Sequence, residues 1–237
     1  MRMTVHPVNG AVMEKDIFDV TTRKGIFLLR KKTLLPDRER VFACMRPVPG
    51  SSLTGDLEEE YQAVLPGFLR CADPGAAVCF TKTGPADADG CLPEGSSTAL
   101  AIAGVGGRLA EFCGRFFREE AYVRGLLADT MANVLLFTLT SELDAWVSEQ
   151  AAAAGTGAAR ILEIPGALPV TWQKTVWEKT KAEELLGIHW RESGVLEPEK
   201  SLTRVYLLEE GSCGKLPVHD CSVCGRKECM YREKSQM

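Results

Sequence analysis

A nearly uninterrupted apolar stretch in the middle of the chain constrains the fold most. Residues 131–140 read MANVLLFTLT, and the nearest charged residues on its two sides are Asp129 and Glu142. The surrounding segment, 108–154, repeats its apolar side chains at the spacing of helices, which predicts two helices. Because the apolar stretch offers almost no polar face to water, we expect its helix to be buried on most sides and to form the core.

Other segments favour strands. The runs AAVCF at 76–80 and TALAIAGV at 98–105 are apolar, and they flank a stretch rich in Gly, Pro and Asp at 84–96. This pattern predicts two buried, paired strands joined by a surface loop. The segment SLTRVYLLEE at 201–210 is a further strand candidate.

Three more elements are predicted outside these regions. Residues 25–48 read as two extended segments around a Leu-Pro-Asp turn, which predicts a hairpin. Residues 54–69 have helical spacing, and Pro66 and Gly67 are expected to kink or end that helix. After an irregular turn, a further helix is predicted over 171–186.

Composition limits the classes of protein to which the chain can belong. Its 237 residues, 45% hydrophobic and 25% charged, suit one large domain or two small ones with a core that needs no disulfides. A net charge of −4 argues against a nucleic-acid-binding surface. The longest uncharged run, thirteen residues at 95–107, is short of the roughly 20 that a membrane-spanning helix needs. No apolar signal segment begins the sequence, so we expect a cytoplasmic protein that does not bind a membrane.

The cysteines are concentrated at the C-terminus. Four of the nine lie within seventeen residues in the pattern C-x7-C-x2-C-x4-C: Cys213, Cys221, Cys224 and Cys229. A C-x2-C turn brings two thiolates to one soft cation, and nearby lysines and arginines favour the thiolate form. The pattern predicts a metal-binding tail over 211–237, following a domain over 1–210. We favour an iron-sulfur cluster at this site. The alternative is zinc, bound by these thiolates with or without His219. A tail of free thiols is the simpler alternative.

Several motifs in the second half of the chain occur together in one known family. They are the helical run AEFCGRFFREEAYVRGLLADTMANVLL at 110–136, the turn and helix start PGALPVTWQKTVWE at 165–178, and the strand entry GIHWRESGVLEPEKSLTRVYLLEEG at 187–211. Their order resembles the activation domain of cobalamin-dependent methionine synthase. The cysteine tail resembles the ending of short, free-standing members found in anaerobes, whereas the first hundred residues resemble the family only loosely.

The resemblance implies a fold and a reaction. The fold would be α+β, a twisted antiparallel sheet flanked by helices that binds S-adenosylmethionine and docks on a cobalamin-binding protein or corrinoid methyltransferase. The reaction would be reductive methylation, in which an external electron reduces cob(II)alamin and the methyl group of S-adenosylmethionine traps the cob(I)alamin. An iron-sulfur centre in the tail could deliver that electron.

The resemblance also implies a set of binding residues. The family's Pro-Gly turn corresponds to Pro165 and Gly166. An arginine before this turn would hold the ligand's carboxylate, because a guanidinium pairs with a carboxylate through two hydrogen bonds, and the nearest one is Arg160. Glu163 would contact the ammonium group or a ribose hydroxyl. Glu142 would supply the helix carboxylate that recognises the ligand's charged groups.

Departures from the family pattern support an alternative function. Arg160 lies five residues before Pro165, farther than the family places its arginine, and Ala167 stands where the family has a tyrosine. The family's helix glutamate aligns with the apolar stretch near Phe137, and Glu142 lies about one turn farther along. The alternative is a non-catalytic, metal-bearing electron-transfer or interaction module that has lost the S-adenosylmethionine pocket.

Overall fold

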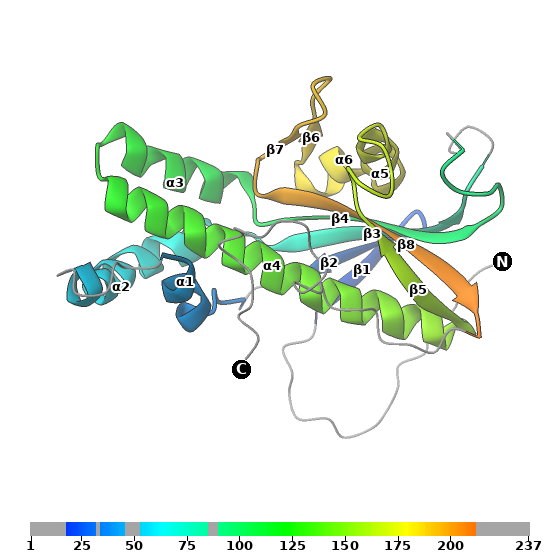
Figure 1. Ribbon diagram of the computed structural model, residues 1–237, viewed down its shortest axis with the longest axis horizontal. Coiled ribbons are helices and arrows are strands. Elements are labelled where there is room, and N and C mark those ends of the chain that lie inside the picture. The colour runs from blue at the N-terminus through cyan, green and yellow to red at the C-terminus, as the bar shows by residue number, and fades with distance from the viewer. Residues whose placement is uncertain (1–17, 32–33, 46–52, 85–89, 212–237) are drawn as a thin grey trace.

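A six-stranded antiparallel sheet forms the centre of the protein (Figure 1). The computed structural model describes residues 18–31, 34–45, 53–84 and 90–211, and the statements below concern these residues. The strands of this sheet, in spatial order, are β1 (Asp19–Arg23), β2 (Ile26–Arg30), β3 (Gly75–Lys82), β4 (Ser97–Gly104), β8 (Ser201–Glu210) and β5 (Thr156–Leu162). The predicted α+β class, with an antiparallel sheet and flanking helices, is confirmed.

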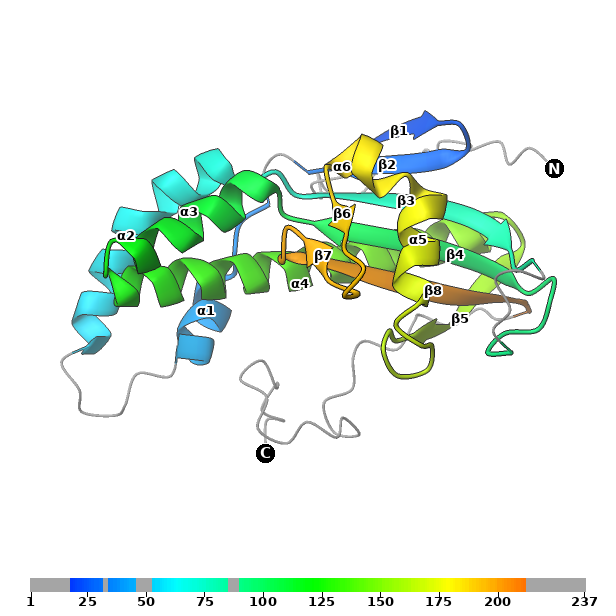
Figure 2. The same ribbon diagram turned by 90° about the horizontal axis from the view of Figure 1, so that it is seen from above.

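Helices cover both faces of the sheet, which makes three layers (Figures 1 and 2). One face carries α4 (Tyr122–Ala153), whose first half extends beyond the sheet beside three further helices: α1 (Arg38–Met45), α2 (Leu53–Cys71) and α3 (Gly107–Arg118). The other face carries α5 (Trp172–Thr180), α6 (Ala182–Leu186) and the small hairpin of β6 (His189–Trp190) and β7 (Leu196–Glu197).

The alternation of side chains along β4 separates the two cores. Ala99, Ala101 and Ala103 are buried on the α4 face, whereas Leu100 and Ile102 are buried on the face of α5 and α6. This follows from the two-residue period of a strand. The alanines present only methyl groups to α4, so this long helix can lie close to the sheet.

The core helix predicted from MANVLLFTLT is confirmed. It is part of α4, and every fourth residue from Met131 through Leu135 and Leu139 to Leu143 is completely buried. By length and mean hydropathy α4 could span a membrane, yet 61% of its most apolar window is buried in the fold. The apolar character of α4 therefore serves packing against the sheet.

The hairpin predicted over 25–48 is wrong in its second half. The first segment is β2, but it pairs with β1 and β3, and the second segment is helix α1. Asp37 caps this helix, since its Oδ1 accepts a hydrogen bond of 3.0 Å from the backbone N–H of Arg40. The cap satisfies an N–H group that has no partner within the helix, and it outweighs the strand propensity of the sequence Val-Phe.

Two predicted helix boundaries also differ from the structure. Helix α2 continues through Pro66 and Gly67 to Cys71, with Val64 and Phe68 on either side of this pair buried in the core. Gly67 lets the ring of Phe112 pack against the helix, since a Cβ at Gly67 would stand 2.8 Å from that ring. The single helix predicted over 171–186 is two helices, α5 and α6, separated at Lys181, whose φ of 55° interrupts the helical hydrogen bonds.

One strand was not predicted. Residues 151–159 read as a helix end and a link, but β5 begins within them at Thr156 and pairs with the second half of β8. The paired strands predicted at 76–80 and 98–105, the two helices within 108–154 and the strand at 201–210 are all confirmed. The boundary between a domain over 1–210 and a tail stays a prediction, since residues 212–237 lie outside the described part of the chain.

The close approach of α4 to β4 predicts that a larger side chain between them destabilises the protein. Replacing the fully buried Ala101 with leucine should destabilise the protein by about 1–3 kcal/mol, because a close-packed core has no space for three more carbons. Urea unfolding of Ala101→Leu measures this change. The exposed Ala145 on α4 gives the control, and Ala145→Leu should leave the midpoint nearly unchanged. Equal midpoints for the two variants would contradict this account of the packing.

Candidate functional site

The first part of β8 has an open edge. Strand β4 pairs with β8 from Ser201 to Leu207, whereas β5 covers only the segment from Val205 to Glu210. Residues 201–204 therefore have no strand partner on their second side among the described elements. Backbone N–H and C=O groups along such an edge can bind a ligand or a peptide. Helix α4 lies over one face of this edge (Figure 1). The turn after β5 lies where the open segment of β8 ends, next to Val205.

Charged side chains connect the start of this edge to α4. The Nζ atom of Lys200 lies 2.7 Å from Oδ1 of Asp129, and it also donates a hydrogen bond of 2.9 Å to Oδ1 of Asn133. The Lys200 side chain is 15% exposed, so this ion pair is partly shielded from water. It fixes the point where the chain enters β8.

A second polar cluster lies farther along, around Asp144. The hydroxyl of Tyr206 donates a hydrogen bond of 2.7 Å to Oδ1 of Asp144, and Nε of Arg204 lies 3.4 Å from the same oxygen. Burial raises the pKa of Asp144 and is opposed by the Arg204 charge and the Tyr206 hydrogen bond. Burial, with the neighbouring Asp144 carboxylate, raises the pKa of the Tyr206 phenol well above its usual range, so this hydroxyl remains a donor.

Arg204 has unused hydrogen-bonding capacity. Its Nε atom is buried and makes no hydrogen bond within the described residues, although the carboxylate of Asp144 is near. A buried N–H without an acceptor costs free energy, which a ligand that supplies an acceptor would recover. The cluster can therefore hold the charged end of a zwitterionic ligand.

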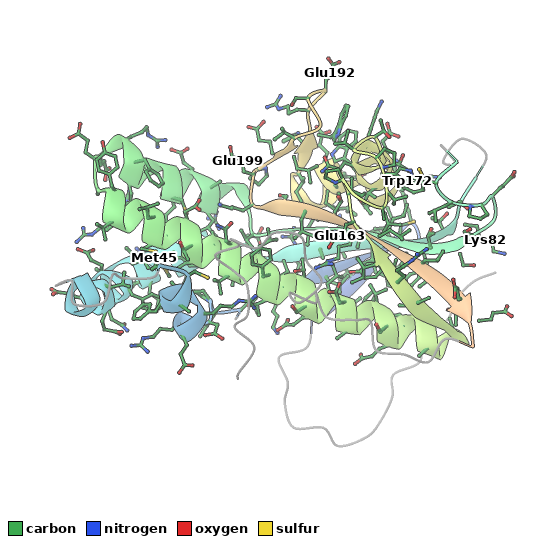
Figure 3. The ribbon with its side chains drawn as sticks, in the orientation of Figure 1. Met45, Lys82, Glu163, Trp172, Glu192 and Glu199 are labelled. Atoms are coloured by element: carbon green, nitrogen blue, oxygen red, sulfur yellow. The ribbon has the colours of Figure 1, made fainter. Side chains whose placement is uncertain are left out.

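The turn after β5 is firmly built. The backbone N–H of Leu168 donates to the carbonyl of Glu163 at 3.1 Å, and the N–H of Gly166 donates to the carbonyl of Leu168 at 3.2 Å. Gly166 has a φ of 151°, a conformation that side-chain-bearing residues rarely adopt. The last pair of β5 with β8 is Leu162 with Val205, so the turn begins where β8 becomes open (Figure 3).

Three of the five predicted binding residues are close in the sequence and form one turn. Glu163, Pro165 and Gly166 all belong to this turn. Arg160 lies on β5, opposite Leu207, and is exposed. Its position alternates with that of Ile161, which contacts the α4-side core, so Arg160 faces the α5 side of the sheet.

Glu142 does not face the open edge. Its Oε2 lies 2.6 Å from Nζ of Lys31, just after β2, on the flank of α4 away from β8. The carboxylate of α4 that faces β8 near the turn belongs to Asp144, two residues farther along, and the guanidinium on this face belongs to Arg204. The sequence carries one weak signal for them, since Arg204 and Tyr206 stand at alternate positions among the apolar residues Leu202, Val205, Leu207 and Leu208 of the strand.

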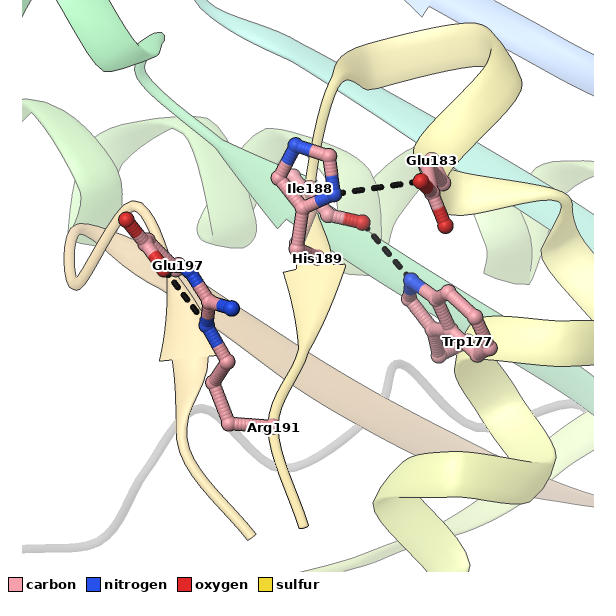
Figure 4. A network of polar contacts seen from close by, with 6 residues as sticks. All are labelled: Trp177, Glu183, Ile188, His189, Arg191 and Glu197. Carbon is pink, nitrogen blue, oxygen red and sulfur yellow. Dashed lines mark hydrogen bonds and ion pairs between the residues drawn. The ribbon is translucent and has the colours of Figure 1, made fainter. Parts of the chain in front are cut away.

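On the face of α5 and α6, polar contacts hold the hairpin of β6 and β7, which leads into β8 (Figure 4). The indole Nε1 of Trp177 on α5 donates a hydrogen bond of 2.7 Å to the carbonyl of Ile188. Nδ1 of His189 lies 3.2 Å from Oε1 of Glu183, and Arg191 pairs with Glu197 across the hairpin. These contacts join α5 and α6 to the hairpin that leads into Lys200 and β8.

The predicted metal ligands Cys213, Cys221, Cys224 and Cys229 lie outside the described residues. Within the described ranges, no group of three or more His, Cys, Asp or Glu side chains could hold a metal ion. Cys44 and Cys113 are buried, and burial raises the pKa of the Cys113 thiol to about 12, so this thiol is protonated. These two cysteines act as small apolar side chains of the core.

Comparison with known proteins identifies a related fold. No protein-family model matches the chain, and no curated protein sequence matches it. Among solved structures, the crystal structure of the MetH reactivation domain bound to AdoHcy is similar, with a TM-score of 0.56 and 12% sequence identity. The match covers 83% of this chain and 82% of that domain. At this identity the comparison establishes the fold.

The cluster around Asp144 predicts that loss of the Tyr206 hydroxyl destabilises the protein more than loss of the Tyr61 hydroxyl. Tyr206→Phe removes a 2.7 Å bond to a largely buried carboxylate and should destabilise the protein by about 1–3 kcal/mol. Tyr61→Phe removes a long contact of 3.5 Å to the carbonyl of Pro36 and should cost less. Chemical denaturation at pH 7 measures both, and an equal or larger loss for Tyr61→Phe would contradict the role given to Asp144.

Proposed function

We propose that this protein is a reactivation factor for a corrinoid protein and that it binds S-adenosylmethionine along the open edge of β8. The observation that carries the proposal is that three features lie along the first half of β8: its open edge, the Gly166 turn that follows the last pair of β5 with β8, and the half-buried Arg204–Asp144 pair. The fold is shared over 83% of the chain with a domain whose crystal structure contains AdoHcy, which supports the same assignment.

The residues present suit the ligand's functional groups. The α-carboxylate can accept a hydrogen bond from Arg204, whose Nε makes no hydrogen bond among the described residues, and the ammonium group can pair with Asp144 or Glu163. The backbone of residues 201–204 and of the turn offers N–H and C=O groups to the adenosine. Arg204 and Asp144 take the roles that the family resemblance implied for Arg160 and Glu142.

The chain's own contribution would be binding and orientation. S-adenosylmethionine supplies an electrophilic methyl group, which the reduced cobalt of a corrinoid on a partner protein accepts. Helix α4 excludes water from one side of the edge, and the rigid turn would hold the ligand in one orientation. A cobalamin-binding protein or corrinoid methyltransferase would be the partner.

Two glycine variants test the binding site. Wild-type protein should be stabilised by about 2.7 kcal/mol when S-adenosylmethionine is present at 100 times its Kd. Gly166→Ala should weaken binding at least tenfold, because alanine cannot hold the φ of 151° that shapes the turn. Gly155→Ala is the matched control, since Gly155 also has a positive φ, of 78°, but lies at the opposite end of β5.

Calorimetric titration and thermal unfolding with the ligand measure these effects. Equal loss of affinity in both glycine variants would place the ligand elsewhere. If the wild-type protein binds no S-adenosylmethionine, the reactivation function is wrong, and the non-catalytic, metal-bearing module becomes the better assignment. The exposed Arg160 and the Ala167 in place of a tyrosine are the observations that favour this second candidate.

We further propose that the C-terminal cysteines bind an iron-sulfur cluster, or zinc in its place, and that the cluster supplies the electron for cobalamin reduction. The C-x2-C spacing of Cys221 and Cys224 within a basic segment supports metal binding. A reducing, cytoplasmic compartment suits such a site.

The tail predicts a spectrum and a metal content. Protein purified without oxygen should be brown, with broad visible absorption and bound iron. Cys221→Ser together with Cys224→Ser should remove the colour and the metal. Cys44→Ser with Cys113→Ser is the control, and it should retain the metal while it destabilises the core. Colourless protein with stoichiometric zinc would exclude electron delivery, and protein without metal would leave only free thiols.

A further inference from the structure

A hollow lies among the helices, away from the open edge of β8. It is formed by α2, α3 and the start of α4, and it has a volume of about 230 Å³. Pockets for drug-sized ligands typically have roughly 300–1,000 Å³, so this hollow suits one side chain or a small anion better than a nucleoside. It is therefore separate from the proposed S-adenosylmethionine site.

The charged residues that line this hollow are all arginines, and we name it the arginine pocket. They are Arg70 on α2, Arg115 on α3 and Arg124 on α4. Arg124 is paired with Glu60, and Arg115 lies 3.6 Å from Glu119. Arg70 makes no ion pair within the described residues, so a positive charge in the pocket remains without a counter-charge.

The floor of the arginine pocket is aromatic. The rings of Phe112 and Phe116 meet edge to face with 5.1 Å between centroids. The guanidinium of Arg115 lies 5.5 Å and 5.3 Å from these two centroids, so it is held over the rings by cation–π attraction. Gly67 allows Phe112 to approach α2, since a Cβ there would lie 2.8 Å from its ring. A fixed guanidinium loses less freedom when it binds a carboxylate.

Exposed apolar side chains stand at the same end of the molecule, and we name them the apolar tip. Phe117, Tyr122, Val123 and Leu126 are 38%, 59%, 47% and 55% exposed around the turn between α3 and α4. The ring of Phe117 lies over Gly125, where a Cβ would be 2.9 Å away. Neighbouring exposed apolar residues of this kind mark interaction sites, and phenylalanine, tyrosine and arginine are enriched in protein interfaces.

We propose that this end of the molecule binds a segment of a partner protein that carries acidic residues beside apolar ones. A carboxylate of the partner enters the arginine pocket between Arg70 and Arg115, and its apolar side chains cover the apolar tip. The pocket alone would suit any small anion. The apolar tip at the same end of the molecule selects a protein segment, because a free anion would leave these side chains in water.

Peptide binding to the full-length, ¹⁵N-labelled protein tests the proposal. The probe is acetyl-Gly-Glu-Glu-Phe-Glu-Leu-Gly-amide, and its counterpart has glutamine at each glutamate. The acidic peptide should shift the amide signals of Gly67 in the pocket and Gly125 below the tip. The glutamine peptide should bind at least tenfold more weakly, and added salt should weaken the acidic peptide.

Variants separate the pocket from general surface charge. Arg70→Ala with Arg115→Ala should weaken the acidic peptide at least tenfold; both side chains are exposed, so thermal unfolding should change little. Arg118→Ala is the matched control, because Arg118 is exposed on α3, pairs with Glu111 and does not line the pocket. It should change affinity less than twofold.

Three outcomes would overturn the proposal. They are no binding of the acidic peptide, equal binding to the double variant, and binding of inorganic phosphate that shifts Gly67 alone and is tighter than that of the peptide. The last result would identify a small-anion site. None of these outcomes depends on S-adenosylmethionine binding, so the two proposals fail independently.

Discussion

The close packing of α4 on the alanine face of β4 is the contact on which the rest of the structure depends. Three alanines, at positions 99, 101 and 103, are completely buried beneath a helix of 32 residues. Small residues on the strand and completely buried leucines on the helix fill this layer, as close packing of an interior favours. Because α4 extends beyond the sheet, the same helix also contributes residues to the arginine pocket and to the apolar tip.

This packing also places the candidate site. One flank of α4 faces the start of β8, and its polar residues Asp129, Asn133 and Asp144 meet Lys200, Arg204 and Tyr206 there. Since β5 ends at Leu162, it leaves the edge of β8 open beside these groups and ends in the Gly166 turn. The proposed ligand site and the proposed partner surface therefore lie on different parts of one helix-and-sheet frame.

Much of the fold could be predicted from periodicity, because apolar spacing reports which faces are buried. The core helix, the paired strands at 76–80 and 98–105 and the strand at 201–210 followed from it. Local rules failed where one contact decided the conformation. The side chain of Asp37 caps α1 in a segment that reads as a strand, and α2 continues past Pro66 with Val64 and Phe68 both buried in the core.

The sequence by itself determined the elements of the core, the Pro165–Gly166 turn and the cysteine spacing of the tail, since each is a local pattern of residue types. Only the tertiary structure decided which charges share the open edge. Glu142 and Asp144 are two residues apart on α4, yet one pairs with Lys31 and the other with Arg204 and Tyr206. Helical rotation sends neighbouring carboxylates to opposite flanks, and only the position of the strands determines which flank borders a site.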